Sequence, residues 1–176
     1  MARRLRCFLL WNLLVLGSDS VWAAMPYPDE LRGLQGVRLS LYIARELSSV
    51  APGVEARIVE DFSSTESRLG LAHVRGQYPM LQVNITGRRL CGEEAQAREF
   101  AVQVVLRLIE PVKLERNPSL DVPVATWWRE LLLIDDQAGI GISIERAVSH
   151  EVTSLMTWVA RFKKEKATEG GSKDGE

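Results

Sequence analysis

The stretch Leu81-Gln-Val-Asn-Ile-Thr86 alternates apolar and polar side chains without interruption. Successive side chains of a β-strand point to opposite faces of its sheet, so this alternation predicts a strand with one face buried and the other in water. The stretch Phe100-Ala-Val-Gln-Val104 has a similar alternation, which runs on to Leu108. Both stretches therefore predict long strands, and the rest of the fold depends on what pairs with them and covers them.

Two further strands are expected in the same sheet. Residues 37–43 alternate apolar and polar side chains, and residues 122–134 are rich in the β-branched and aromatic residues that favour strands. Periodicity leaves open which of Trp127 and Trp128 points inward.

The connections between these strands are predicted from polar and proline-containing segments. A short strand is expected over residues 73–75, a Glu-rich loop over 87–98, and a turn at Asn117-Pro-Ser119 within a second long connection over 111–121. The two long connections should lie at opposite ends of the sheet. The Pro111 imide cannot donate a hydrogen bond to a neighbouring strand, so Pro111 should lie at an edge, a bulge or a strand switch.

Two helices are predicted from apolar residues that recur every three or four positions. The first spans about residues 54–72 and has a polar middle. The second spans about Ser143 to Lys164, with Ser143 as its N-cap. Its apolar side comprises Ile144, Val148, Val152, Leu155, Val159 and Phe162. Residues 167–176 have too little apolar content to offset the entropy of ordering and should form a disordered tail.

These elements predict an α+β fold with a single mixed or mostly antiparallel sheet of about four strands and two helices packed on one face. Residues 24–166 should form one domain. The first strand, the first helix and the next strand can form a right-handed crossover, which would pair two strands in parallel at one side of the sheet. The order of the strands stays open.

The first 23 residues read as a secretory signal peptide. A basic leader with Arg3, Arg4 and Arg6 precedes the apolar run Cys7–Gly17, and compact residues surround a cleavage position near Ala23. The apolar run is shorter than the ~20 residues that a spanning helix needs, so no transmembrane segment is expected after cleavage. The mature protein is therefore expected in the bacterial periplasm or outside the cell.

Cleavage would also change the charge of the chain. The leader takes three arginines and Asp19 with it, so the formal charge falls from −1 to −3. A nucleic-acid-binding protein normally has a concentrated basic patch, which this composition lacks, so no nucleic acid is expected as a partner. Cys91 would be the remaining cysteine, which excludes an internal disulfide bond.

Short blocks of the mature sequence carry a resemblance. They are Leu34-Gln-Gly-Val37, Thr65-Glu-Ser-Arg-Leu69 with Ala72, Pro79-Met-Leu-Gln-Val83, Val104 to Val112, and Ala125-Thr-Trp127. Together these blocks resemble small exported bacterial domain proteins of uncharacterised function. The resemblance spans nearly the whole mature chain and implies a fold, but no catalytic residues.

The residue types that usually carry chemistry are few and scattered. His73 and His150 are the imidazoles of the chain, and neither has a second histidine or a cysteine at metal-ligand spacing. Asp61 and Glu151 are expected at the margins of the apolar helix sides, each paired with an arginine. The acidic pair Asp135-Asp136 is interpreted as a turn rather than as a calcium site. We expect no cofactor, no metal and no catalytic residue.

The uncovered face of the sheet is the predicted binding surface. Polar and aromatic side chains on such a face can recognise another protein, a peptide or a glycan. The residues that share this face are Arg38, Tyr42, Gln82, Asn84, Gln103 and Arg107. The leading hypothesis is a non-catalytic binding or structural module of the bacterial envelope.

Two alternatives remain open. One is a small periplasmic enzyme, similar to a hydrolase, whose carboxylates converge with His73 in the fold. The other is a carrier of an apolar ligand, which requires a cavity between sheet and helices that ordinary packing does not leave.

Overall fold

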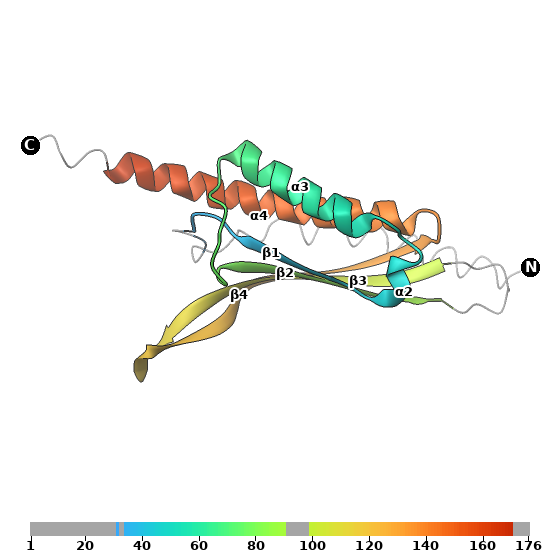
Figure 1. Cartoon of the computed structure of the whole chain (residues 1–176), viewed down its shortest axis with the longest axis horizontal. Coiled ribbons are helices and arrows are strands. Elements are labelled where there is room, and N and C mark those ends of the chain that lie inside the picture. The colour runs from blue at the N-terminus through green and yellow to red at the C-terminus, as the bar shows by residue number, and fades with distance from the viewer. Residues whose placement is uncertain (1–30, 32–33, 91–98, 171–176) are drawn as a thin grey trace, which may run out of the picture.

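The fold is a four-stranded sheet with its two long helices on one face (Figure 1). The computed structural model describes residues 31, 34–90 and 99–170, with the backbone alone at 165–170. Its elements are β1 (Arg38–Ile43), α2 (Arg45–Ser48), α3 (Val54–Leu69), β2 (Met80–Arg89), β3 (Glu99–Leu114), β4 (Asn117–Asp136) and α4 (Ile140–Gly170). The predicted α+β class is confirmed, whereas the short helix α2 was not predicted.

The strands follow one another in the order β1-β2-β3-β4. β1 and β2 are parallel, and the other two pairs are antiparallel, so the sheet is mixed. The parallel pair was expected from the crossover, in which α3 carries the chain back across the sheet between β1 and β2. β1 and β4 are the edge strands.

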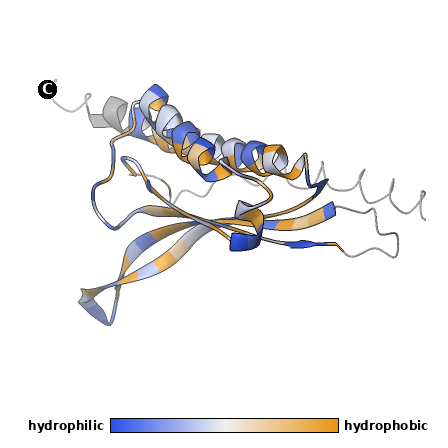
Figure 2. Ribbon diagram, turned by 45° about the vertical axis from the view of Figure 1, so that its right-hand side comes forward, coloured by the Kyte–Doolittle hydropathy of each residue, from blue (hydrophilic) through white to orange (hydrophobic). Residues whose placement is uncertain are grey.

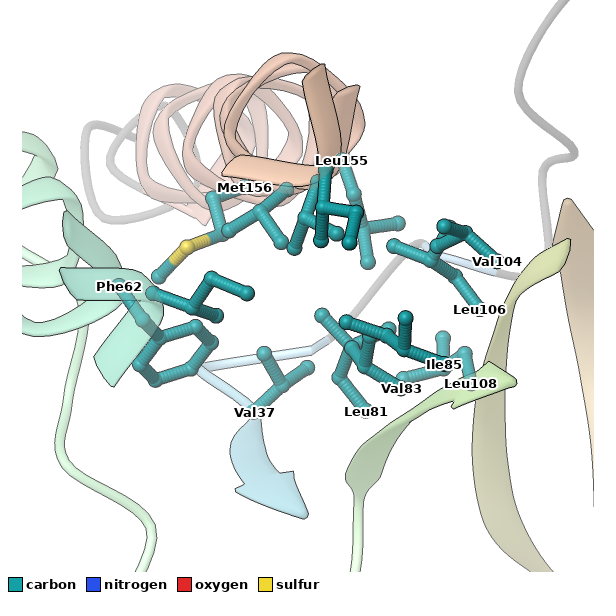
Figure 3. Packing of buried hydrophobic residues seen from close by; sticks show 14 of the residues in the cluster. Val37, Phe62, Leu81, Val83, Ile85, Val104, Leu106, Leu108, Leu155 and Met156 are labelled. Atoms are coloured by element: carbon teal, nitrogen blue, oxygen red, sulfur yellow. The ribbon is translucent and has the colours of Figure 1, made fainter. Parts of the chain in front are cut away.

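The core lies between the sheet and the two helices (Figure 3). Leu81, Val83 and Ile85 of β2 are fully buried, as the period-two pattern predicted. Every second residue of β3 from Phe100 to Leu108 is also buried on this side. The apolar side of α4 covers them. Figure 2 shows that the helices turn apolar residues toward the sheet.

The end of α3 is tied to the segment that precedes β1. The Ala72 N–H donates to the carbonyl oxygen of Gln35 at 3.0 Å. Gly36 makes this approach possible, because a Cβ at that position would lie 2.1 Å from the Ala72 carbonyl oxygen. The strand predicted over residues 73–75 is wrong: the residues between α3 and β2 form an irregular connection.

β2 is longer than predicted. Gly87–Arg89 belong to the strand, where Arg88 is paired with Ala101, although these residues were assigned to a loop. Pairing with β3 prolongs β2 despite its polar end. The rest of the predicted loop, residues 91–98 with Cys91, lies outside the described residues.

β3 and β4 continue beyond β2 as a two-stranded arm, residues 110–124, which projects away from the helices (Figure 1). The turn of this hairpin is at Glu115-Arg116, so the predicted turn at 117–119 and the long connection over 111–121 are wrong. β2 begins at Met80, opposite Ile109, so Pro111 lies beyond β2, where β3 has β4 as its strand neighbour in the sheet. The expected edge position of Pro111 is therefore confirmed, next to a register shift at Leu108/Ile109.

α4 begins earlier than predicted. The Asp136 carboxylate accepts hydrogen bonds from the N–H groups of Ala138 and Gly139, at 2.9 and 2.7 Å, which forms the turn that starts the helix at Ile140. Ser143 therefore lies within the helix and is not its N-cap. The helix continues to Gly170, so residues 167–170 of the expected tail are helical, and 171–176 lie outside the described residues.

Candidate functional site

The residues predicted as a binding surface all lie on the sheet face opposite the helices. They alternate with the half-buried apolar residues of β1 and the buried residues of β2 and β3. Tyr42 is opposite Asn84, and Gln82 is opposite Arg107, so these side chains are neighbours across the strands. Arg38 and Gln103 lie on the same face. Tyr42 is 58% exposed, so its ring is available for contact.

The same face carries an apolar column on β4 that sequence reasoning missed. Trp128, Leu132 and Ile134 are 66%, 70% and 59% exposed. Trp128 is paired with Arg107, and Leu132 with Gln103, so the column borders the polar residues. The sequence of β4 contains a signal for this column, because its apolar residues lie on both faces. A strand that covers a core with one face needs apolar residues on that face alone.

Part of this face is already engaged within the sheet. The Gln103 side-chain amide donates to Glu130 Oε1 at 2.5 Å, across β3 and β4. Gln103 is therefore already hydrogen-bonded within the sheet. To bind a ligand through its side-chain amide, it would have to give up the hydrogen bond to Glu130.

A groove runs along the other edge of the sheet, between α3 and β1. Its volume is about 580 Å³. One wall is formed by β1, with Leu39 and Leu41, together with Val37, the residue just before it. The facing side of α3 provides the other wall, and the connection after α3 closes one end. The lining residues outside β1 are Glu55, Val59, Phe62, Ser63, Glu66, His73, Val74 and Arg75.

The backbone of β1 leaves hydrogen-bonding groups at this groove. The Arg38 N–H donates to the Pro79 carbonyl oxygen at 3.0 Å, and the Ala44 N–H donates to the Ile85 carbonyl oxygen at 2.9 Å. The backbone N–H groups of these even-numbered residues therefore point toward β2. Because successive backbone groups of a strand point to opposite sides, the N–H and C=O groups of Leu39 and Leu41 point to the outer edge.

Glu66 is the most unusual polar residue of the groove. It is 8% exposed, and none of the described residues forms a hydrogen bond with its Oε1 atom. Its Oε2 atom lies 3.4 Å from Nδ1 of His73, whose side chain is 76% exposed. A buried polar atom without a partner costs about 1–3 kcal/mol, so the Oε1 atom of Glu66 lowers the stability of the fold. The sequence pattern did not single this residue out.

The fold brings His73 beside a carboxylate, as the enzyme hypothesis requires, but does not complete a nucleophilic site. Ser63 lines the same groove as Glu66 and His73. The Ser63 hydroxyl donates to the carbonyl oxygen of Val59 at 3.0 Å, which is the ordinary bond of a helical serine. A nucleophile would instead donate to the histidine base.

The other acidic residues have structural partners. Glu151 lies 3.8 Å from Arg129, as expected, whereas Asp61 accepts a hydrogen bond from Ser149 rather than from an arginine. The exposed His150 is on the polar side of α4.

Asp135 and Asp136 belong to the turn before α4. Ser143 donates to Asp135 at 2.5 Å, and this bond, together with the Asp136 N–H, lowers the pKa of the Asp135 carboxyl below its ordinary value. In the described part of the chain, His, Cys, Asp and Glu side chains do not gather in threes at metal-binding distance.

Comparison with known proteins leaves the chain without an assigned family. No protein-family model matches it, and no curated protein matches it. Within the described residues, no helix has the length and apolar character required to cross a membrane.

Proposed function

We propose that this protein is an exported, non-catalytic binding module of the bacterial envelope that takes up an extended polypeptide segment along β1. The segment would add a strand to the sheet, and its inward side chains would enter the groove below α3. Export is supported by residues 1–23, which read as a signal peptide.

The observation that carries this proposal is the combination of a strand edge with an adjacent groove. Strand addition needs outward N–H and C=O groups, which Leu39 and Leu41 supply, and the hydrogen bonds to them are independent of sequence. Specificity comes from alternate side chains that enter a pocket, and the wall formed by Val59 and Phe62 supplies apolar contacts for them.

A small hydrolase is the second candidate, because His73 and Glu66 are neighbours in the groove. It has less support than strand addition, since the Ser63 hydroxyl is committed to a main-chain carbonyl oxygen. A carrier of an apolar ligand would need space in the core, where the buried side chains of the sheet and the helices form one cluster (Figure 3).

Selection from a displayed library of random short peptides, followed by amide hydrogen exchange, tests the proposal. A selected peptide should slow exchange at the Leu39 and Leu41 amides. It should leave Ser40 and Tyr42 nearly unchanged, because their N–H groups face β2. A selected peptide that protects neither outward amide, or a library that yields no binder, would contradict strand addition.

A matched pair of variants locates the binding. Val59→Trp places a large side chain in the groove, at a position that is already 45% exposed. Glu60→Trp makes a comparable addition at the next exposed position of α3, which does not line the groove. Val59→Trp should abolish binding of the selected peptide, and Glu60→Trp should preserve it. Equal effects of both variants would place the peptide elsewhere.

A further inference from the structure

We infer that the groove selects a strand with a basic side chain, lysine or arginine, whose cationic group binds the carboxylate of Glu66. This inference rests on the proposed strand addition at β1 and names the chemical class of its partner. One side chain of the bound segment contacts Glu66. The groove recognises the rest of the segment through its backbone and its apolar side chains.

The first support is the state of the Glu66 carboxylate. Glu66 is more than nine-tenths buried and lines the groove, and within the described part of the chain its Oε1 atom lacks a hydrogen-bond donor. His73 approaches Oε2 at 3.4 Å, which is a weak contact, and the imidazole is mostly in solvent. An incoming ammonium or guanidinium group would supply the donors that the carboxylate lacks, in a place where water screens little.

The second support is the position of Glu66 along the groove. Ala72, which follows α3, is hydrogen-bonded to Gln35, so the end of α3 lies at the start of β1. Glu66 and Leu39 line the same groove. A residue paired with Leu39 in an added strand directs its side chain to the same face as Leu39, which is the face under α3. The basic residue is therefore expected opposite Leu39.

The charged side chains at the rim of the groove do not reverse the preference for a basic residue. Arg38 and Arg75 also line the groove, but both are exposed, so solvent and salt screen them. The exposed carboxylate of Glu55 lies toward the start of α3, at the other end of the same wall. Glu55 provides a matched control, since it carries the same charge in the same groove without burial.

The experiment compares three capped peptides with the pattern Thr-Val-Thr-X-Thr-Val-Thr, in which X is lysine, norleucine or glutamate. Norleucine keeps the alkyl chain of lysine and removes the charge. Dissociation constants are measured for the full mature protein and for Glu66→Gln and Glu55→Gln, with amide exchange at Leu39 and Leu41 as a report of the binding mode. Thermal unfolding of each variant checks that it is folded.

The wild-type protein should bind the lysine peptide at least about tenfold more tightly than the norleucine peptide, and the glutamate peptide least. Glu66→Gln should remove this preference while it keeps the norleucine affinity, and Glu55→Gln should retain the preference. Equal affinity of the wild-type protein for lysine and norleucine, with Leu39 and Leu41 protected, overturns the role of Glu66 and leaves strand addition standing. If no peptide protects these amides, strand addition itself is refuted. The wild-type comparison decides the question even if Glu66→Gln does not fold.

Discussion

Replacement of the adjacent Trp127 and Trp128 by alanine, one at a time, tests which face of β4 is packed. Trp127 is 5% exposed and faces the helices, opposite Leu108, whereas Trp128 is 66% exposed and lies on the open face, opposite Arg107. The two variants remove the same side chain from neighbouring positions of one strand. Their intrinsic effect on strand formation is therefore similar, and the difference between them reports burial.

The expected loss of unfolding free energy in each variant follows from the side-chain area that folding removes from water. A tryptophan side chain presents about 200 Å², of which about 190 Å² is buried at Trp127 and about 70 Å² at Trp128. At about 25 cal/mol per Å², these areas correspond to about 5 and about 2 kcal/mol as upper bounds. Alanine keeps part of each contact, so we expect losses of about 4 kcal/mol for Trp127→Ala and about 1 kcal/mol for Trp128→Ala.

The assay is equilibrium unfolding in urea, followed by circular dichroism because each variant changes the tryptophan fluorescence. The two free energies of unfolding should differ by about 3 kcal/mol, with little change in the dependence on urea concentration. A similar loss for both variants would refute the assignment of faces. It would mean that the open face of the sheet is covered in solution.

Three other perturbations have defined outcomes. Gly36→Ala should lower the free energy of unfolding by about 1–3 kcal/mol, since the new methyl group forces the backbone of Ala72 away; urea unfolding measures this. Leu106→Ala, at a fully buried position, should lower it by about 2–5 kcal/mol in the same assay. Ser143→Ala should raise the pKa of Asp135 toward its ordinary value, because the strongest hydrogen bond to the carboxylate is lost; a carboxyl titration by NMR measures this pKa.

Each of these has a control or a contrary result. Gly76→Ala should be nearly neutral, since a Cβ there meets its nearest neighbour at 3.5 Å, and a loss as large as that of Gly36→Ala would contradict the close approach. Leu132→Ala should change stability by about 0.5 kcal/mol or less, because this residue is 70% exposed. An unchanged titration of Asp135 in Ser143→Ala would show that the hydroxyl is not its main partner.

The pH dependence that Asp135 contributes has a definite sign. Its pKa is lower in the folded protein than in the unfolded chain, so the unfolded chain binds the proton more readily. The stabilisation is present above the unfolded-state pKa and is lost as the pH falls through the folded-state pKa. Stability should therefore decrease in acid, and Ser143→Ala should show less of this decrease.

Local periodicity was sufficient to predict a helix or strand where one face of that element is buried and the other is in water. The alternation in β2 and β3 and the apolar side of α4 predicted those elements because a strand and a helix expose their side chains with different periods. Periodicity could not orient β4, where both faces are apolar, although the strand itself was predicted. The turn prediction was wrong because Asn117-Pro-Ser119 has a turn-like composition but belongs to β4. Ser143 has the composition of an N-cap, but the hydrogen bonds that Asp136 accepts start the helix three residues earlier.

The candidate groove was not predictable from any one segment. Its walls come from β1 and α3, and its end comes from the connection that holds His73, which the crossover folds back against the start of β1. Glu66 occupies an ordinary helical position between Thr65 and Ser67 in the sequence, and its burial depends on that connection. The predicted residues of the open face, by contrast, share one face because strand alternation is local.

The amino-acid sequence by itself determined the α+β class, the main strands and helices, and which residues of β2 and β3 are buried. Those features follow from backbone geometry and the cost of exposing apolar side chains, and both act within a few residues of the chain. The tertiary structure alone decided that β1 is an edge strand, that Trp127 rather than Trp128 is buried, and that Glu66 lies in a groove without a donor for Oε1. These depend on contacts between segments far apart in the chain, which no local pattern encodes.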